Sequence, residues 1–236
     1  MKRRKRKKVT AMGLAVVMAA TVPMQVFATE GVEENTQVNE QVNEQADVTG
    51  SAVGEQTEGF SFQFDATTGT AAVTGYTGVD TAIVIPAQTV KGGITYKVTS
   101  VAERAFYNND SIISVIFEGG IKNIGNSAFE HCDSLQKVEL CDSIESMGEG
   151  VFSGCSQLKE VRLSAGLKQI SNRAFSGCKN LKEIQIPDAV ELINSWSFNN
   201  CTSLEKVVFS NSSMCKKIGS QAFVRCTALK NIMLTP

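Results

Sequence analysis

The chain has 236 residues, of which 42% are hydrophobic and 20% charged, a composition typical of a globular protein rather than a wholly disordered one. Its formal charge of −1 averages two unlike parts, because seven of the 23 basic residues lie at positions 2–8, and the other 16 basic residues against 24 acidic ones leave −8. Without that basic cluster the chain is not expected to bind nucleic acid or an anionic membrane surface. A single His weakens metal and acid–base proposals.

The first 28 residues have the three parts of a secretory signal peptide. The basic positions 2–8 precede an apolar stretch from Val9 to Ala20, and Val26-Phe27-Ala28 provides suitable residues before a cleavage site. The alternative is an uncleaved membrane anchor, but the apolar stretch is shorter than the roughly 20 residues that span a bilayer. We therefore expect cleavage near Ala28, a secreted or cell-surface protein, and membrane contact only through the uncleaved signal segment.

Residues 29–59 contain eight acidic residues, no basic residue and no aromatic residue. Such a segment cannot bury enough apolar surface to offset the entropy lost on ordering. We expect a disordered acidic linker.

Residues 60–100 carry several strand patterns. Alternating apolar residues predict strands at 60–64, 72–76 and 83–85, and Gly92-Gly93 predicts a hairpin through residues 90–94. We expect this segment to be an N-terminal β-hairpin cap that includes the strand of a first coil, because the open end of a repeat array must be covered.

Residues 101–236 repeat a pattern of about 23 residues. Each copy has a Phe, a Cys three residues later, and apolar residues six, nine and eleven residues after the Phe. Asn109 replaces the Cys in the first copy. The six Phe residues are Phe106, Phe129, Phe152, Phe175, Phe198 and Phe223. One such coil is too small to bury its apolar positions alone, so the pattern predicts a solenoid of stacked coils sharing one core.

The two halves of each coil have different patterns. The LxxVxL segment, as at Leu135, Val138 and Leu140, alternates as a short strand does, and strands of successive coils must run parallel. The segment 125–132 begins with turn and cap residues and predicts a single helical turn that packs Phe129 inward. The fold class expected is an α/β repeat with one short parallel strand and one short helical turn per coil.

The repeated pattern IGxxAFxxCxxLxxVxL, with the lead-in at 74–101, resembles the bacterial BspA-like (treponemal-type) leucine-rich repeats. The resemblance covers roughly residues 70–236. It implies a leucine-rich-repeat solenoid in an exported or surface-displayed bacterial protein, and some members are adhesins that bind host or bacterial proteins. The sequence departs from the pattern at Asn109 and has no recognisable C-terminal cap after Leu234.

Seven cysteines in an exported chain suggest disulfides, and a one-per-coil ladder suggests a metal site. Equivalent side chains in stacked coils point in parallel directions, however, which suits neither disulfide geometry nor convergence on an ion. We expect reduced, core-packed thiols at the ladder positions and Cys215, possible exposure of Cys141, and no cofactor or metal. The ladder consists of Cys132, Cys155, Cys178, Cys201 and Cys226.

No catalytic motif occurs in the chain, and we expect no enzyme activity. His131 and Trp196 occupy outward positions of the repeat. The outward residues of the strands form the candidate protein-binding face: Lys137, Glu139, Glu160, Arg162, Glu183, Gln185 and Lys206. The register places Lys137 beside Glu160, Glu139 beside Arg162, and Glu183 beside Lys206. These charges either pair across strands to keep the sheet soluble or form a mixed-charge surface for a partner.

The sequence therefore predicts an exported, non-enzymatic leucine-rich-repeat module that binds a protein, either a host or a bacterial surface protein, or mediates adhesion. The alternative is a structural spacer or display stalk of the cell envelope without a dedicated ligand. The oligomeric state is left open.

Overall fold

The computed structural model describes residues 58–234, and the signal peptide and nearly all of the linker predicted above lie outside this range. Within it the regular structure is entirely β-strand. Among the described residues there is no helix with the length and apolar character that crossing a bilayer requires.

The N-terminal part is a mixed sheet. β1 (Phe60–Asp65) pairs antiparallel with β2 (Thr70–Tyr76), which runs parallel to β5 (Ile94–Val101). β4 (Gln88–Lys91) and β5 form an antiparallel hairpin around Gly92 and Gly93, where the sequence predicts one. The expectation of a simple hairpin cap needs correction, because β5 also pairs with β2 and with the solenoid strand β7 (Asn123–Ile124), so this sheet is continuous with one side of the solenoid.

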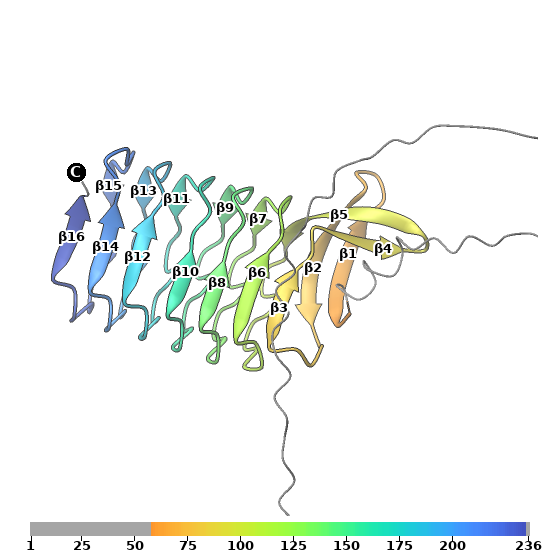
Figure 1. The fold of residues 1–236 in the computed structure, drawn as a ribbon, viewed down its shortest axis with the longest axis horizontal. Helices are drawn as coiled ribbons and strands as arrows, with labels where there is room; N and C mark the ends of the chain where they lie inside the picture. The colour runs from red at the N-terminus through yellow and green to blue at the C-terminus, as the bar shows by residue number, and fades with distance from the viewer. Residues whose placement is uncertain (1–57, 235–236) are drawn as a thin grey trace, which may run out of the picture. The chain divides into compact units, whose positions relative to one another are not determined.

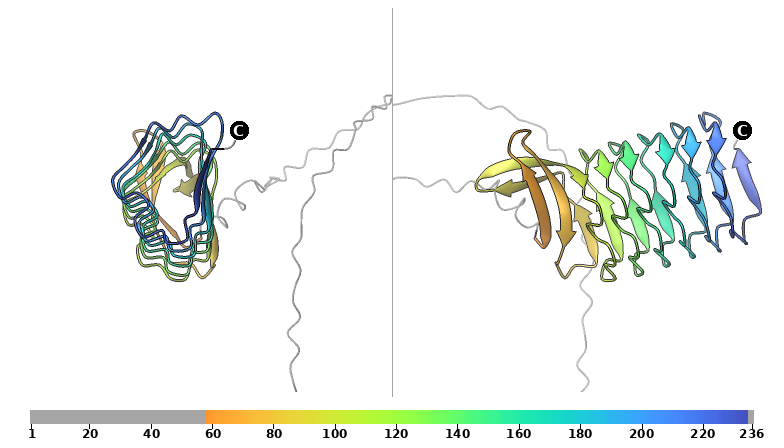
Figure 2. Two further views of the ribbon diagram at one scale, coloured as in Figure 1. Left: turned by 90° about the vertical axis from the view of Figure 1, so that its left-hand side faces the viewer. Right: turned by 180° about the vertical axis from the view of Figure 1, so that it is seen from behind.

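Each later coil contains two strand segments rather than one (Figure 1). The long strands lie on one side and the short strands on the other, and the chain turns between them (Figure 2). The long strands are β3 (Ala82–Ile85), β6 (Ser114–Phe117), β8 (Lys137–Glu139), β10 (Glu160–Arg162), β12 (Glu183–Ile186), β14 (Lys206–Phe209) and β16 (Asn231–Leu234). The short strands after β7 are β9 (Ser146–Met147), β11 (Gln169–Ile170), β13 (Leu192–Ile193) and β15 (Lys217–Ile218).

The long strands pair in parallel as predicted, but in two groups. One sheet has the order β10-β8-β6-β3 and the other the order β12-β14-β16. The short strands divide at the same coil, since β5, β7 and β9 form one run and β11, β13 and β15 another.

The predicted helical turn is wrong: no described residue of the Phe-containing segments is helical. In a helix each N–H donates to a carbonyl of its own segment, whereas here alternate N–H groups donate to the next coil, as from Phe129 to Val151 O at 2.9 Å. The residues two before and two after each Phe adopt left-handed conformations, with φ of 52° at Ser127 and 58° at His131. Gly154, Gly177 and Asn200, each directly before a Cys, are among these left-handed residues.

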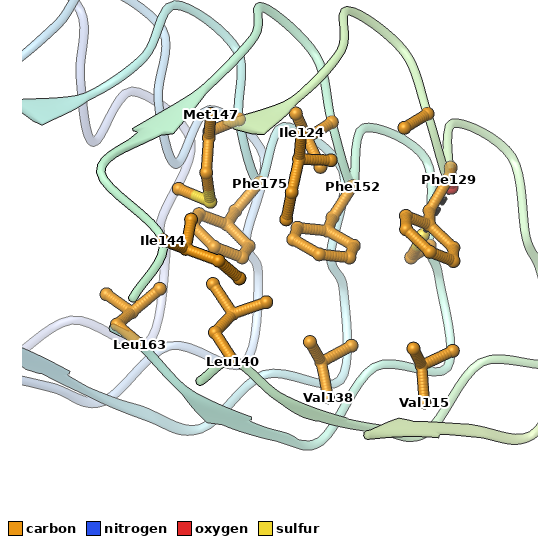
Figure 3. Packing of buried hydrophobic residues seen from close by; sticks show 14 of the residues in the cluster. Val115, Ile124, Phe129, Val138, Leu140, Ile144, Met147, Phe152, Leu163 and Phe175 are labelled. Carbon is orange, nitrogen blue, oxygen red and sulfur yellow. Dashed lines mark hydrogen bonds between the residues drawn. The ribbon is translucent and has the colours of Figure 1, made fainter. Parts of the chain in front are cut away.

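The core is one continuous column between the two strand sides. The six Phe rings stack face to face along it, with centroid separations from 4.5 Å for Phe106–Phe129 to 5.5 Å for Phe152–Phe175. Figure 3 shows Phe129, Phe152 and Phe175 in a row, with Val138 approaching from the long strands and Met147 from the short ones. Five of these Phe residues, all except Phe223, are fully buried, which confirms the inward position that the repeat predicts.

Candidate functional site

The long-strand side presents the predicted face to solvent. Alternation along each strand buries Val138 and Ile184 and turns their neighbours outward. Six of the seven predicted face residues are exposed, and Glu139 is half-buried. The register is the predicted one, with Lys137 opposite Glu160, Glu139 opposite Arg162, and Glu183 opposite Lys206.

A groove of about 520 Å³ lies on this face across β8, β10 and β12. All the predicted face residues except Lys206 line it. The groove also includes Lys159 and Lys182, which precede β10 and β12 and which the sequence analysis missed. The repeat could have identified these two lysines as outward residues, because both occupy the same repeat position, two residues before the inward Val161 and Ile184.

The groove coincides with the gap between β10 and β12. Because these two strands are not paired, Val161 is only half-buried, whereas its equivalents Val138 and Ile184 are buried. A second groove of about 490 Å³ shares Val161, Arg162 and Gln185 with the first and extends to Pro187 and Ala189. The two hollows thus form a continuous depression with an aliphatic floor at Val161 and a charged rim.

The charges of the rim pair differently from the predicted pattern. Lys137 binds Glu139 of its own strand at 2.7 Å rather than Glu160. Arg162 binds Asp142 at 2.9 Å and donates from Nη1 to the Leu140 carbonyl at 2.6 Å, so it does not bind Glu139. Side chains two residues apart on one strand share a face, which puts Glu139 within reach of Lys137.

Other predicted and observed features of the rim agree. Lys206 and Glu183 form the predicted ion pair at 3.4 Å. The hydrogen bond to Glu139, together with its charge, raises the pKa of Lys137. These pairs are exposed, so each contributes little to stability.

Two cations of the groove have no carboxylate partner among the described residues. Lys159 donates from Nζ to the Gln136 side-chain oxygen at 3.0 Å, and neither Lys159 nor Lys182 takes part in an ion pair there. They occupy equivalent positions on the two sides of the gap. The groove therefore offers two unpaired ammonium groups beside an aliphatic floor, which suits contact with carboxylate and aliphatic side chains of another protein.

A larger hollow of about 710 Å³ lies at the C-terminal coil. Its lining includes Ile218 and Ile232, whose side chains are 47% and 46% exposed, although their equivalents Ile193 and Val207 in the preceding coil are buried. No following coil covers these residues within the described range. The hollow is therefore the uncovered face of the last described coil, and the exposure of Ile218 is what such a face predicts.

The ladder cysteines are part of the core. Cys132, Cys155, Cys178 and Cys201 are buried, which confirms their predicted packing, and Cys226 of the last coil is half-buried. Each thiol donates to the carbonyl of the Phe 26 or 28 residues earlier, as from Cys155 Sγ to Phe129 O at 3.0 Å. Burial raises the pKa of Cys155 and Cys178 and keeps these thiols protonated. Cys141 and Cys215 are half-buried, so Cys215 is less enclosed than expected.

The residue types that bind metal ions are not clustered in the described part of the chain. No group of three or more His, Cys, Asp or Glu side chains there is placed to hold a metal ion. His131 is exposed and lies edge-on to the Tyr107 ring at 6.3 Å, and Trp196 is exposed on the same turn side, as their repeat positions predict.

Comparison with known proteins agrees with the observed coil geometry. The model of the BspA type leucine rich repeat region matches in six copies over residues 90–190 and 157–236, which is more than half of the chain. A leucine rich repeat protein of T. pallidum is 24% identical, with a TM-score of 0.65 over 75% of this chain and 80% of that chain. This likeness shows the solenoid fold.

Two further solved structures are more distant in shape. A leucine-rich repeat protein of Bacteroides capillosus is 29% identical over 64% of this chain and 94% of that chain, with a TM-score of 0.44. A leucine rich cell surface protein of Faecalibacterium prausnitzii is 18% identical over 76% of this chain and 94% of that chain, with a TM-score of 0.40. No curated protein matches the chain. The six repeat matches together with the two-sided coil establish that the chain belongs to the BspA-type leucine-rich-repeat family.

Proposed function

We propose that this protein is exported and acts without catalysis as a protein-binding or adhesion module, using the groove across β8, β10 and β12. The observation that carries the proposal is the depression itself, in which six predicted face residues surround the half-buried Val161. Extended solenoid surfaces commonly serve as binding faces because they hold many side chains in fixed register. The unpaired Lys159 and Lys182 favour a partner with acidic side chains.

Export is proposed from the sequence of the first 28 residues, with cleavage near Ala28. The test is N-terminal sequencing of the protein recovered from the surface and medium of the producing cells. A chain beginning near Thr29 supports export, and an intact Met1 in the cell interior contradicts it. This outcome is independent of whether the groove binds a partner.

The spacer or display stalk remains a second candidate, and a specific observation favours it. Five of the six face charges are already neutralised within the chain, in the pairs Lys137–Glu139, Arg162–Asp142 and Lys206–Glu183. A face that is satisfied internally needs no ligand to be soluble. The two functions differ in whether the groove residues matter for retention of a partner.

The binding test compares the mature chain with a fourfold charge reversal, K137E, E160K, R162E and E183K, which leaves the net charge unchanged. Both are used to capture proteins from host-cell and bacterial surface extracts. We expect the reversal to weaken binding of the retained partner by about tenfold or more, since mismatched charges at an interface reduce affinity.

The matched control is the double variant H131A and W196A on the turn side, which should bind as the unaltered chain does. Melting curves of both variants verify folding. Loss of binding in the control alone would move the site to the turn side. A mature chain that retains no partner would favour the spacer.

A further inference from the structure

One coil interface is built differently from the others. The interface between the coil of Phe152 and the coil of Phe175 is here called the central interface. At the other four interfaces between successive Phe residues, both the long and the short strands pair. At the central interface neither β10 with β12 nor β9 with β11 does so.

The individual backbone hydrogen bonds show the same interruption on the long-strand side. The Lys159 N–H donates to Gln136 O at 2.9 Å, and the Glu205 N–H donates to Lys182 O at 2.8 Å. Lys182 occupies the equivalent position at the central interface, and its N–H has no such bond to the preceding coil among the described residues. The Arg162 guanidinium meanwhile ties β10 to the Leu140 carbonyl of the coil before it.

The short-strand side is interrupted at Ser171. The Gly148 N–H donates to Ile124 O at 2.7 Å, and the Asn194 N–H donates to Ile170 O at 2.9 Å. At the central interface the Met147 carbonyl instead accepts a bond from the Ser171 hydroxyl at 2.5 Å. A side-chain bond thus replaces the backbone bond.

The sequence gives a reason for the change at Ser171. The equivalent positions in other coils include Gly125, Gly148 and Gly219, where a Cβ would lie 2.4–2.5 Å from a backbone nitrogen of the preceding coil. Ser171 stacks on the Gly148 coil and carries that Cβ, so the two backbones cannot approach as closely. Asn194 also has a side chain, but it stacks on Ser171 and its Nδ2 joins its backbone N–H on the Ile170 carbonyl.

The turn side of the central interface is intact. The N–H groups of Gly150, Phe152 and Gly154 donate to the next coil at 2.9, 2.8 and 2.7 Å. The rings of Phe152 and Phe175 remain stacked at 5.5 Å. The two halves of the solenoid are therefore joined by backbone bonds along the turn side, by core contacts and by side-chain bonds such as that from Asn180 Nδ2 to Ser156 O at 3.0 Å. The backbone pairing of both strand sides is interrupted.

We propose that the solenoid bends at the central interface, with the turn side as the hinge and the two strand sides opening. Segments with few backbone hydrogen bonds open at lower free energy than fully paired ones. Opening would widen the depression at Val161 and leave the coils on each side rigid. This motion is a property of the fold beyond the proposed binding function and does not depend on a ligand.

The test is residue-resolved amide hydrogen exchange on the mature protein without a ligand. The backbone N–H of Lys182 should exchange at least about tenfold faster than those of Lys159 and Glu205, which occupy equivalent exposed positions. The N–H groups of Phe152 and Gly154, which cross the same interface at the hinge, should stay protected. Equal exchange at the three strand positions would overturn the proposal. Fast exchange at Phe152 and Gly154 would also overturn it, because the interface would then separate as a whole.

A variant tests the assigned cause. S171G removes the Cβ and should slow exchange of the residue 171 amide to the rate at Gly148. N194G is the matched control: its backbone amide is already bonded, so its exchange should change by less than about twofold. Unchanged exchange at residue 171 in S171G would overturn the assignment of the interruption to Ser171. The bend itself is tested separately, by comparing exchange at Lys182 and Lys159 in the unaltered chain.

Discussion

Replacing the central ring, Phe175→Ala, tests the stacked core most severely. Phe175 is fully buried and lies between two rings, Phe152 at 5.5 Å and Phe198 at 5.3 Å. Truncating a buried Phe costs about 3–5 kcal/mol in lost burial and residual cavity. Both stacking contacts are lost as well, each worth about 0.5–1.5 kcal/mol beyond burial, so the upper part of that range is expected.

The matched control is Phe223→Ala. Phe223 is half-buried and, among the described residues, stacks on a single ring, Phe198 at 5.3 Å, so its truncation should cost roughly half as much. Equilibrium urea unfolding of the two variants and the unaltered chain gives the free energies, and a constant m-value verifies that the unfolding reaction is the same. Phe175→Ala being no more destabilising than Phe223→Ala would refute the continuous aromatic column.

Three other outcomes follow from the packing and the charges. A thiol reagent at pH 8 should label Cys141 and Cys215 in the native protein but should reach Cys155 and Cys178 only after denaturation, because burial raises the pKa of the Cys155 and Cys178 thiols. Rapid labelling or oxidation of Cys155 and Cys178 in the native protein would contradict their core position. Gly148→Ala should lower the free energy of unfolding by about 1–3 kcal/mol in a melting experiment, because its Cβ would lie 2.4 Å from Asn126 N. In the control variant Gly119→Ala the new Cβ meets nothing within 4 Å, so the change should be nearly neutral. Equal effects of the two substitutions would show that the coils are not in close contact at Gly148. Hydrogen bonds from the Ala165 N–H and from Arg162 lower the pKa of Asp142 below 3.8, so the stability that the Asp142 carboxylate contributes is present above that pH and is lost as the pH falls through the folded value. The difference in Tm between Asp142→Asn and the unaltered chain should therefore vanish at low pH. A difference in Tm that grows on acidification would contradict this direction of the pKa shift.

Periodicity predicts most of this fold because each coil must use the same positions for its core. The inward Phe129, the buried Cys155 and the register of Lys137 with Glu160 all follow from spacing alone. The prediction of a helical turn at 125–132 was wrong, because the composition of this segment suits both a helix and a chain of turns. What decides is the partner of each N–H, and the neighbouring coil provides it.

The site was predicted in outline and missed in its details. Alternation identifies which strand residues face outward, but side-chain length and local reach decide their ion pairs, so Lys137 binds Glu139 and Arg162 binds Asp142. The gap beside Val161 was not predictable from the pattern of apolar residues, which is intact there. The interruption on the short-strand side does have a sequence signal, Ser171 in place of glycine, which becomes meaningful only once the close approach of glycines to the preceding coil is known.

The binding role of the groove is tested most directly by a hydrogen-exchange footprint of the mature protein with and without its captured partner. The account predicts slower exchange in the segments 159–162 and 182–185, which line the groove, and unchanged exchange in the turn-side segments 126–131 and 195–200. Protection confined to the turn side, or a bound partner that leaves 159–162 and 182–185 unprotected, would contradict it.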